Sequence, residues 1–436
     1  MASPSLSKED RVKGLLYGIM VGDALNMPVH WYYNTESLKK DYGTGIASYL
    51  APRDPHPESM TDGQFYRPNP EVFSTYTRLS QNPLNIYHDK RPFFNLTDAI
   101  RRATDVTVDE HGNRLSKPPA ERTHYHSGLP AGTNTMPTTV LVRELLASVA
   151  SNGGYDPDKY LEAFRDFFLA PGRNTDTYCE VFVRRFFESL SFDKPLRECA
   201  LEQRNVWSVA SNSSLLGVAV LTGGAFLAGL SADDAVSICQ AHHDLTHKGP
   251  NIDMAASVYV PLLYSLLEGK PLREAVEGAA SSLSLPKITG KELVGMYRDY
   301  KGPGQIPNDV VWRIHTEFRE EKFDVGAYSA SERKDEEVVG LEGEISSMCY
   351  TEHSLPAILF FAHRHGGDFM GPTLANLYAG GDNTGRGALL GAILGAAHGL
   401  SGIPSDLVEG LAASPASDVE SFVDLAAGGR LFGAHK

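Results

Sequence analysis

The sequence predicts an all-α fold, a compact single domain of many helices that spans residues 1–436. Three observations support this prediction. From about residue 157 onward, apolar residues recur mainly at helical spacing. The alternation of apolar and polar residues that is typical of strands is scarce along the whole chain. Glycines recur four residues apart in two otherwise apolar segments, one near each end of the chain.

The two glycine rows predict a pair of helices in close contact. Residues four apart lie on the same face of a helix, so a row of glycines leaves that face without side chains. Each glycine inside a helix costs about 0.5–1 kcal/mol relative to alanine, and several in a row indicate a packing requirement. We therefore expect the two helices to pack face to face. The rows consist of Gly14, Gly18 and Gly22, and of Gly387, Gly391, Gly395 and Gly399.

Local signals indicate where several helices begin. Ser7 and Asp10 have the spacing of a capping box, and so do Ser231 and Asp234. Pro137 suits the first turn of another helix. Further helical patterns occur at 160–168, 176–190, 201–230, 253–268, 270–284, 289–300, 353–365 and 373–378.

Two long stretches lack a helical pattern. Residues 34–130 are rich in proline, glycine, histidine, tyrosine and asparagine, and they are too long for a simple loop in a compact domain. We interpret them as an irregular insertion with short helices that covers a site. Residues 301–345 are predicted to form a polar, charged connection.

The composition excludes several classes of protein. A net charge of −14 argues against a surface for nucleic acids or anionic membranes, although a local arginine can still hold a small anion. Apolar runs stay below the roughly 18 residues that a membrane span needs. The four cysteines are scattered without CxxC spacing, as expected for reduced thiols in a cytoplasmic protein. The expected partner is a small-molecule ligand.

Polar residues gather in five short segments, at 23–30, 124–135, 176–178, 244–247 and 382–386. Each has a structural alternative: His124 and His126 can be packed loop residues, and Asp23 can cap a turn. His243 and His247 have the i, i+4 spacing of a metal-binding pair, but a role at the helix end explains them better. The sequence contains no P-loop, nucleophile elbow or Rossmann fingerprint.

Three motifs, in order along the chain, carry a resemblance to a known family. They are Gly14-xxx-Gly18-xxx-Gly22-Asp23-Ala24-Leu25-xx-Pro28, then Leu245-Thr246-His247, and finally Gly380-Gly381-Asp382 followed by Gly391 and Gly395. In this combination the chain resembles the ADP-ribosylglycohydrolase family, which includes dinitrogenase-reductase-activating glycohydrolase and the J1-type crystallins. The resemblance implies an all-α domain with the site between its helices, and a hydrolysis assisted by two Mg²⁺ ions.

The metal-binding motifs of that family are altered in this sequence. The T-D-D-T motif falls best on Gly132-Thr133-Asn134-Thr135, which contains no aspartate. In the G-G-D-x-D-T motif, Asp382 is kept and Thr384 replaces the second aspartate, while His30 stands where the family has a glutamate. Mg²⁺ prefers anionic oxygen ligands. We therefore predict no cofactor and no binuclear Mg²⁺ site, with a single Mg²⁺ at Asp382 as the alternative.

The substitutions keep the site polar, which favours a changed function over a decayed one. Histidine acts as an acid or a base near neutral pH, and an arginine can clamp a carboxylate or a phosphate. The predicted catalytic residues are His30, His126 and Asp382. The predicted ligand-binding residues are Asp23, Asn134, Thr135, His247, Asn383, Thr384 and Arg386.

The sequence leaves three functions open. The first is a metal-independent, glycosidase-like hydrolase that acts on a C–N or glycosidic bond, or on a small anionic or ribosyl ligand. The second is a Mg²⁺-dependent ADP-ribosyl hydrolase. The third is a non-catalytic protein that binds a ligand or has a structural, crystallin-like role. Activity that resists chelation separates the first function from the second.

Overall fold

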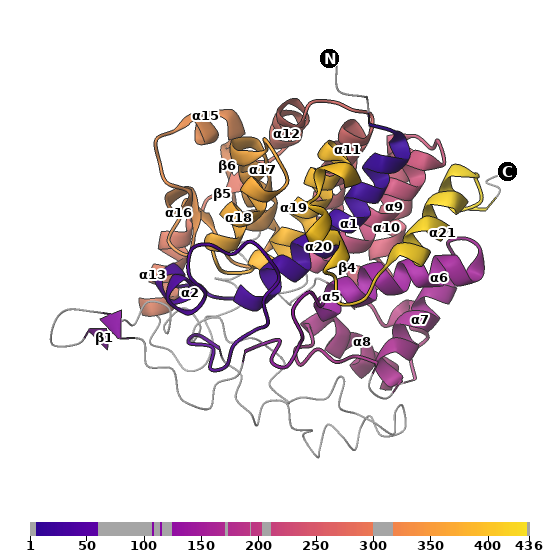
Figure 1. The fold of residues 1–436 in the computed structure, drawn as a ribbon, viewed down its shortest axis with the longest axis horizontal. Helices are drawn as coiled ribbons and strands as arrows, with labels where there is room; N and C mark the ends of the chain where they lie inside the picture. Colours follow the sequence, from indigo (N-terminus) through magenta and orange to yellow (C-terminus); the bar gives the residue numbers. More distant parts are fainter. Residues whose placement is uncertain are drawn as a thin grey trace.

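The computed structural model describes residues 6–59, 107–108, 114–115, 124–170, 173–191, 193–202, 211–299 and 317–433 (Figure 1). In these ranges the chain is mostly helical, which confirms the predicted fold class. The described strands are short and pair in twos. β1–β2 and β5–β6 are antiparallel, whereas β3–β4 and β7–β8 are parallel. Packed helices therefore supply the core.

The elements of the N-terminal half are α1 (Lys8–Asn26), η1 (Met27–Val29), α2 (Thr35–Tyr42), β1 (Thr107–Val108), β2 (Arg114–Leu115), α5 (Met136–Thr138), η3 (Thr139–Arg143), α6 (Glu144–Asn152), α7 (Pro157–Leu169), α8 (Val181–Ser191), η4 (Leu196–Glu198), β3 (Leu201–Glu202), η5 (Asn212–Leu215) and α9 (Leu216–Leu227). Those that follow are α10 (Ala232–His243), β4 (His247–Lys248), α11 (Pro250–Leu267), α12 (Leu272–Ala280), β5 (Ser284–Pro286), α13 (Gly290–Asp299), β6 (Phe318–Lys322), α15 (Val325–Ala330), α16 (Asp335–Val338), β7 (Val339–Gly340) and β8 (Ile345–Ser346). The last are α17 (Thr351–His365), α18 (Met370–Tyr378), α19 (Asn383–His398), η6 (Leu400–Gly402), α20 (Ser405–Glu409) and α21 (Ala416–Ala427).

The helices α1 and α19, from opposite ends of the chain, pack against each other in the middle of the molecule (Figure 1). Their glycine rows meet in antiparallel order. A Cβ atom on Gly18 would collide with the carbonyl group of Gly391, and one on Gly395 would collide with that of Gly14. The predicted contact between the two glycine rows is therefore confirmed. The facing pairs are Gly14 with Gly395, Gly18 with Gly391 and Gly22 with Gly387.

Other helices complete the core around this pair. α9 packs on α1, while α11 and α17 pack on α19. The predicted capping box of α10 is present, since Ser231 Oγ accepts from the Asp234 N–H and the Asp234 carboxylate accepts from the Ser231 N–H. The Ser7 hydroxyl likewise accepts from the Asp10 N–H at the start of α1.

The pattern at 176–190 forms a shorter helix than predicted, because α8 begins only at Val181. The Asp176 carboxylate accepts a hydrogen bond from the backbone N–H of Tyr178. Such a local side-chain bond offers the backbone an alternative to the helix.

The pattern at 201–230 is not one helix either. Leu201 and Glu202 pair with β4, and α9 begins at Leu216. Before α9, the Ser214 hydroxyl bonds to the Ser211 carbonyl in a 3₁₀ turn, so serine side chains again compete with helical hydrogen bonds.

Part of the stretch at 301–345 is structured, although it was predicted as a connection. From residue 317 onward it contains β6, α15, α16, β7 and β8. β6 has the sequence FREEK and pairs with β5, and its last three residues are exposed. A strand that is mostly exposed to solvent has little alternation of apolar and polar residues, so its sequence does not predict a strand.

The described part of the predicted insertion at 34–130 packs over the segment that follows α1. His56 Nε2 lies 3.1 Å from the His30 carbonyl oxygen, and the Glu58 carboxylate accepts from the N–H groups of Tyr33 and Asn34. The short helix α2 lies in the same region. Apart from β1 and β2, residues 60–123 lie outside the described ranges, so the rest of this prediction stays open.

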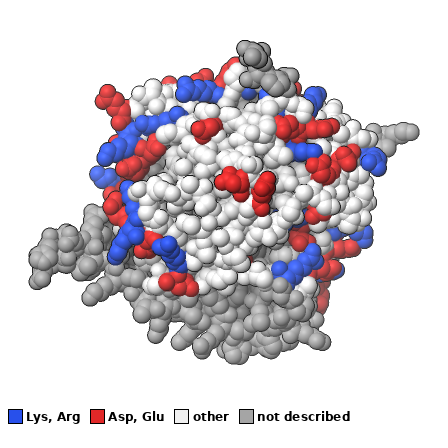
Figure 2. Space-filling view, in the orientation of Figure 1, with Lys and Arg blue, Asp and Glu red and all other residues white. Residues whose placement is uncertain are grey.

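Two surface properties bear on function. None of the described helices has both the length and the apolar character needed to cross a membrane. Figure 2 shows one face of the molecule, where acidic and basic side chains lie mainly around the edge and the centre is largely uncharged.

Candidate functional site

The helix pair α1 and α19 brings His30 next to Asp382. His30 follows the short η1 turn at the end of α1, and Asp382 is the N-cap of α19, where its carboxylate accepts from the Gly385 N–H. His30 Nε2 lies 2.9 Å from Asp382 Oδ1. Two residues 352 positions apart in the sequence thus form one buried polar contact, as the matching glycine rows led us to expect.

Two glycines lock this contact in place. Gly380 and Gly381 have φ angles of 69° and 66°, in the left-handed region that favours glycine. The Gly381 N–H donates to the Tyr32 carbonyl at 2.7 Å, and the Trp31 N–H donates to the Gly381 carbonyl at 2.9 Å. A Cβ atom on Gly381 would collide with the Ser347 carbonyl. The loop before α19 is therefore tied directly to the His30 segment.

A second histidine extends the contact. His30 Nδ1 lies 2.6 Å from His126 Nε2, and His126 Nδ1 lies 2.8 Å from Asp176 Oδ1. The side chains of Asp176, His126, His30 and Asp382 thus form a continuous hydrogen-bonded series, which we call the polar chain. Each of the four residues is at most 7% exposed. The structure brings together the three predicted catalytic residues and adds Asp176 to them.

Proton counting defines the charge state of the polar chain. The links Asp176–His126, His126–His30 and His30–Asp382 each need one proton, whereas two neutral imidazoles supply only two. With both carboxylates ionised, one histidine is an imidazolium, and the net charge is −2 + 1 = −1. Burial lowers the pKa of His30 to about 4, which favours the neutral form of this ring. Because its Nε2 faces the Asp382 carboxylate, His30 then donates from Nε2 and accepts at Nδ1.

Further donors bond to the two carboxylates and fix their orientation. Asn212 Nδ2 donates to Asp382 Oδ2 at 2.7 Å. The N–H of Met136 donates to Asp176 Oδ2 at 2.7 Å, and the N–H of Tyr178 donates to Asp176 Oδ1 at 3.2 Å. Hydrogen bonds to the charged form of a carboxylate favour that form.

Glu180 is a site residue that the sequence analysis missed. It is only partly buried, and its Oε2 accepts from the hydroxyls of Ser213 at 2.8 Å and Ser211 at 3.3 Å. Burial is the main cause that raises the pKa of Glu180 to about 7, and the charge of Asp382 adds to it, while the serine hydrogen bonds and His126 act in the opposite direction. Glu180 therefore lies within electrostatic range of both ends of the histidine pair. A single glutamate before an apolar helix carries no motif that identifies it from sequence.

Three of the predicted ligand-binding residues form a separate buried cluster. Asp23 accepts from Asn134 Nδ2 at 3.0 Å, from the Thr135 N–H at 2.8 Å and from the Thr135 hydroxyl at 2.6 Å. Burial raises the pKa of Asp23. Asn134 Oδ1 accepts from the Arg143 guanidinium at 3.3 Å. This cluster joins the segment at 134–135 to α1.

Asn383 and Thr384 lie beside Asp382 in the first turn of α19. Asn383 Nδ2 donates to the Leu377 and Val29 carbonyls at 3.0 and 3.3 Å. Asn383 Oδ1 and the Thr384 hydroxyl are buried and have no hydrogen-bond partner among the described residues. These two oxygens can still accept one donor or hold one weakly bound cation.

Arg386 does not have the position of an anion clamp. Its side chain is fully buried, and its guanidinium donates to Asn376 Oδ1, the Ser347 carbonyl and the Gly380 carbonyl at 2.9, 2.7 and 2.5 Å. Burial lowers its pKa to about 10, so it keeps its charge at neutral pH. Arg386 is a cation at this position, as the sequence indicates, but its guanidinium donates to acceptors of the protein itself and not to a ligand.

His247 stands apart from the polar chain as well. Its ring packs on Phe182 with centroids 4.2 Å apart, and its Nδ1 bonds to the Thr246 hydroxyl at 2.8 Å. Burial lowers its pKa to about 3, so the ring is neutral. None of its described contacts reaches the polar chain, and we leave it out of the candidate site.

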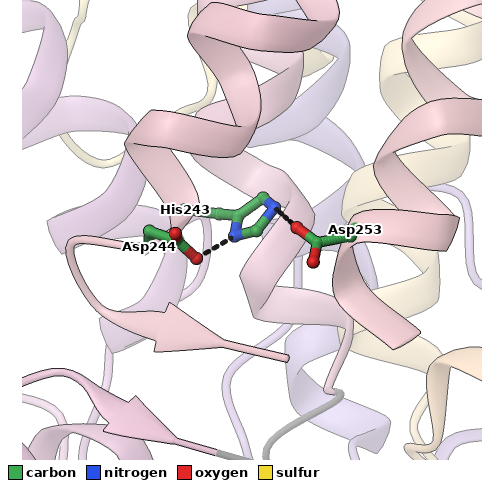
Figure 3. A group of neighbouring side chains, drawn as sticks. All are labelled: His243, Asp244 and Asp253. Atoms are coloured by element: carbon green, nitrogen blue, oxygen red, sulfur yellow. Dashed lines mark ion pairs between the residues drawn. The ribbon is translucent and has the colours of Figure 1, made fainter. Parts of the chain in front are cut away.

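His243 and His247 do not form a metal-binding pair in the described structure. Instead, the His247 carbonyl lies 3.1 Å from His243 Nδ1. Figure 3 shows Asp244 and Asp253 on opposite sides of the buried His243 ring, 3.4 Å from Nδ1 and 3.2 Å from Nε2. One ligand atom from each of the three residues lies within 4.8 Å of the others, but each carboxylate faces a different nitrogen of the same ring. The pairing of His243 at the end of α10 is therefore with the two aspartates and not with His247.

The residues at the family's metal positions do not fit a pair of Mg²⁺ ions. Both oxygens of Asp382 already accept from His30 and Asn212. Asn134 Oδ1 faces the Arg143 guanidinium, whose positive charge opposes a nearby cation. Two divalent ions need several anionic oxygens, and this donor set supplies one carboxylate that is already hydrogen-bonded.

Comparison with protein-family models identifies a family for this chain. A family model for ADP-ribosylglycohydrolase matches residues 93–435. Among solved structures, an "ADP-ribosylglycohydrolase-related protein complex" is 16% identical, with a TM-score of 0.49, and the match covers 98% of this chain and 99% of that one. A likeness of this size says nothing about function, and no curated protein matches. Because the family model covers most of its length, the chain belongs to the ADP-ribosylglycohydrolase family.

Proposed function

We propose that this chain is a metal-independent hydrolase that cleaves a C–N or glycosidic bond of a small ribosyl or anionic ligand. The observation that carries the proposal is the position of Glu180 beside the polar chain. Glu180 is a partly exposed carboxyl with a pKa of about 7, within electrostatic range of the ionised Asp382. A neutral acid near a fixed carboxylate is the pair that hydrolysis of such bonds requires.

Glu180 would act as the general acid. Near neutral pH about half of its carboxyl groups hold a proton, because the pKa is close to the ambient pH. The C–N or C–O bond breaks with its electron pair moving to the leaving atom, which takes the proton from Glu180. Water then adds to the cationic carbon and returns a proton to the Glu180 carboxylate, so the enzyme ends in its starting state.

Asp382 would stabilise the positive charge that develops on the sugar carbon. His30, Asn212 and the Gly385 N–H fix the orientation of its carboxylate. The sequence analysis likewise places Asp382 among the catalytic residues.

His30 and His126 serve in this proposal as positioning residues instead of the direct acid or base. Both ring nitrogens of each histidine are bonded to protein groups, so neither presents a free nitrogen to a ligand. His30 bonds to Asp382 and His126 bonds to His30, so together they fix the orientation of the Asp382 carboxylate. Their predicted chemical role therefore passes to Glu180.

One observation favours a second candidate, ADP-ribosyl hydrolysis with a single bound Mg²⁺. The buried oxygens of Asn383 and Thr384 next to Asp382 could complete a weak site for one ion. Dependence of the activity on Mg²⁺ separates this candidate from the first.

The test is the release of ribose or ADP-ribose from ADP-ribosyl-arginine, ADP-ribosyl-serine and simple N-ribosides, with and without EDTA. We expect release that EDTA does not abolish, and its loss in Glu180→Gln and Asp382→Asn. Glu420→Gln, which replaces an exposed glutamate paired with Lys13, is the matched control and should keep full activity. Release that stops in EDTA supports the Mg²⁺-dependent candidate. If no substrate is cleaved and none raises the melting temperature, the proposal is wrong and a structural role remains.

A further inference from the structure

A cavity of about 230 Å³ lies beside the polar chain. Arg143 and Arg173 line it, and Asp176 of the polar chain forms part of its wall. Ala412 also lines it, and the Ala412 N–H donates to the Gly132 carbonyl at 2.9 Å, which fixes this side of the cavity. Its volume is below the usual range of about 300–1,000 Å³ for pockets that hold drug-sized ligands. The cavity therefore suits a small molecule or a single functional group.

Arg143 lines the cavity and forms no direct ion pair with a described carboxylate, although Asp418, Glu144 and Asp23 lie within electrostatic range of it. The only hydrogen bond of its guanidinium to the described residues goes to the neutral amide of Asn134, at 3.3 Å. None of the described carboxylates lies within ion-pair distance of it. Burial lowers its pKa, but an arginine still stays protonated at neutral pH. A partly buried guanidinium that lines a cavity and makes no direct ion pair keeps donors that a bound anion can accept from.

The backbone at Arg143 has an unusual conformation. Thr139–Arg143 forms a π-helical turn between α5 and α6. Single π turns inside helices occur frequently at functional sites. This turn places both Thr139 and Arg143 on the cavity wall.

Arg173 adds a second positive group, which is already held in place. Its Nη2 atom lies 2.5 Å from Glu144 Oε2, and its guanidinium lies 5.7 Å from the centre of the Phe167 ring. Its side chain is 45% exposed, so its donors can turn toward a ligand.

The one carboxylate on the cavity wall does not neutralise Arg143. Both oxygens of Asp176 accept from His126, and they also accept from the N–H groups of Met136 and Tyr178. Both oxygens of Asp176 are therefore engaged within the polar chain and by the backbone, and neither contacts Arg143.

From these contacts we propose that the cavity is a binding site for a small anion, a carboxylate or a phosphate group, with Arg143 as its main ligand. The guanidinium of Arg143 offers paired N–H donors that match two oxygens of either group. Arg173 contributes a second charge, and Thr139, Asn174 and Thr175 supply neutral polar groups. The site goes beyond the proposed hydrolysis, because anion binding requires no reaction.

The experiment measures binding of inorganic phosphate and of acetate by calorimetry, with sodium chloride added to keep the ionic strength constant. We expect Arg143→Met to weaken binding by about tenfold or more, since hydrogen bonds to charged groups are among the strongest. Arg143→Lys should lose less affinity because it keeps the charge. Arg165→Met, on the exposed side of α7, is the matched control and should bind as the wild type does.

Two outcomes would overturn the proposal, and two further measurements guard the interpretation. Wild-type affinity in Arg143→Met, or no binding of either anion to the wild type, would overturn the proposal. Melting curves without ligand show whether Arg143→Met is folded. If it is not, the affinity of Arg143→Lys for the two anions is compared with that of the wild type instead, and an unchanged affinity in Arg143→Lys would also count against the proposal. Binding by Glu180→Gln at wild-type affinity supports the site even where hydrolysis fails, so failure of the proposed function and failure of this inference are distinguishable.

Discussion

The Nδ1 atom of His30 lies 2.6 Å from the Nε2 atom of His126, so two buried imidazole rings share one proton. Each ring uses its other nitrogen to contact a carboxylate, Asp382 on one side and Asp176 on the other. The series joins four segments that are distant in the sequence. It follows that the loss of one ring should disturb both stability and the orientation of the Asp382 carboxylate.

Replacing His126 by leucine should destabilise the protein. The change leaves the buried His30 Nδ1 without a partner and removes the imidazole from Asp176, which keeps only its two backbone N–H donors. A buried polar group left unsatisfied costs about 1–3 kcal/mol. We expect the free energy of unfolding to fall by at least about 2 kcal/mol, measured by urea denaturation. The control His365→Leu removes a partly exposed histidine paired with Asp335 and should cost less than about 1 kcal/mol. Equal losses in the two variants would show that His126 is an ordinary packed residue.

Hydrolysis should depend on the protonation of Glu180. A general acid works only while it holds its proton, and the pKa of Glu180 is raised to about 7. The rate should therefore fall as the pH rises through about 7. In Glu180→Gln this alkaline limb of the pH–rate profile should disappear, together with most of the activity. A rate profile from pH 5 to 9 tests this. A limb that persists in Glu180→Gln would assign the acid to another group.

The same carboxyl should also make stability depend on pH. Its pKa is raised from 4.5 to about 7 in the folded state, so its contribution to stability is fully present below about pH 4.5 and is lost as the pH rises through about 7. Glutamine keeps the side chain neutral at every pH. We expect Glu180→Gln to be more stable than the wild type by about 1–3 kcal/mol at pH 8, with little difference near pH 4. Urea denaturation at both values measures this, and a pH-independent difference would contradict it.

The contact between α1 and α19 should not tolerate one added methyl group. A Cβ atom on Gly391 would collide with the Gly18 carbonyl, and overpacking of this kind costs about 1–3 kcal/mol. Gly278 lies in α12 with no atom near its added Cβ. Gly278→Ala should therefore stabilise the protein by about 0.5–1 kcal/mol, while Gly391→Ala destabilises it. The two melting temperatures should move in opposite directions, and a shared direction would argue against the close helix contact.

Arg386→Lys should lower stability more than ligand affinity. Lysine cannot reach the three acceptors that the guanidinium satisfies, and each acceptor left unsatisfied costs about 1–3 kcal/mol. Urea denaturation gives the loss. If the variant instead unfolds like the wild type and fails to bind phosphate, then Arg386 is the anion ligand that the sequence first indicated.

Much of the fold could be read from local patterns. The glycine rows predict the contact between α1 and α19, and Ser231 with Asp234 predicts the start of α10. The residues within each glycine row, and within the capping box, lie only a few positions apart in the sequence. Helical geometry alone therefore places the glycines of a row on one face of their helix. β6 could not be predicted in this way, because it is a strand owing to its pairing with β5 and not owing to its own composition.

The candidate site was recovered only in part. His30, His126 and Asp382 were named from their motifs, and the structure brings them together. Glu180 has no motif. The direction in which the side chain of Arg386 points depends on carbonyl groups that lie up to 39 residues away.

The sequence by itself determined that two smooth-faced helices meet and that polar residues at their ends share a site, because periodicity and glycine spacing are local properties of the chain. Only the tertiary structure decided which of those polar groups are free to meet a ligand. A hydrogen-bonding side chain can be satisfied by partners from any part of the chain. Whether such a side chain has all its hydrogen-bond partners depends on the packing of the whole chain and cannot be predicted from the residues next to it in the sequence.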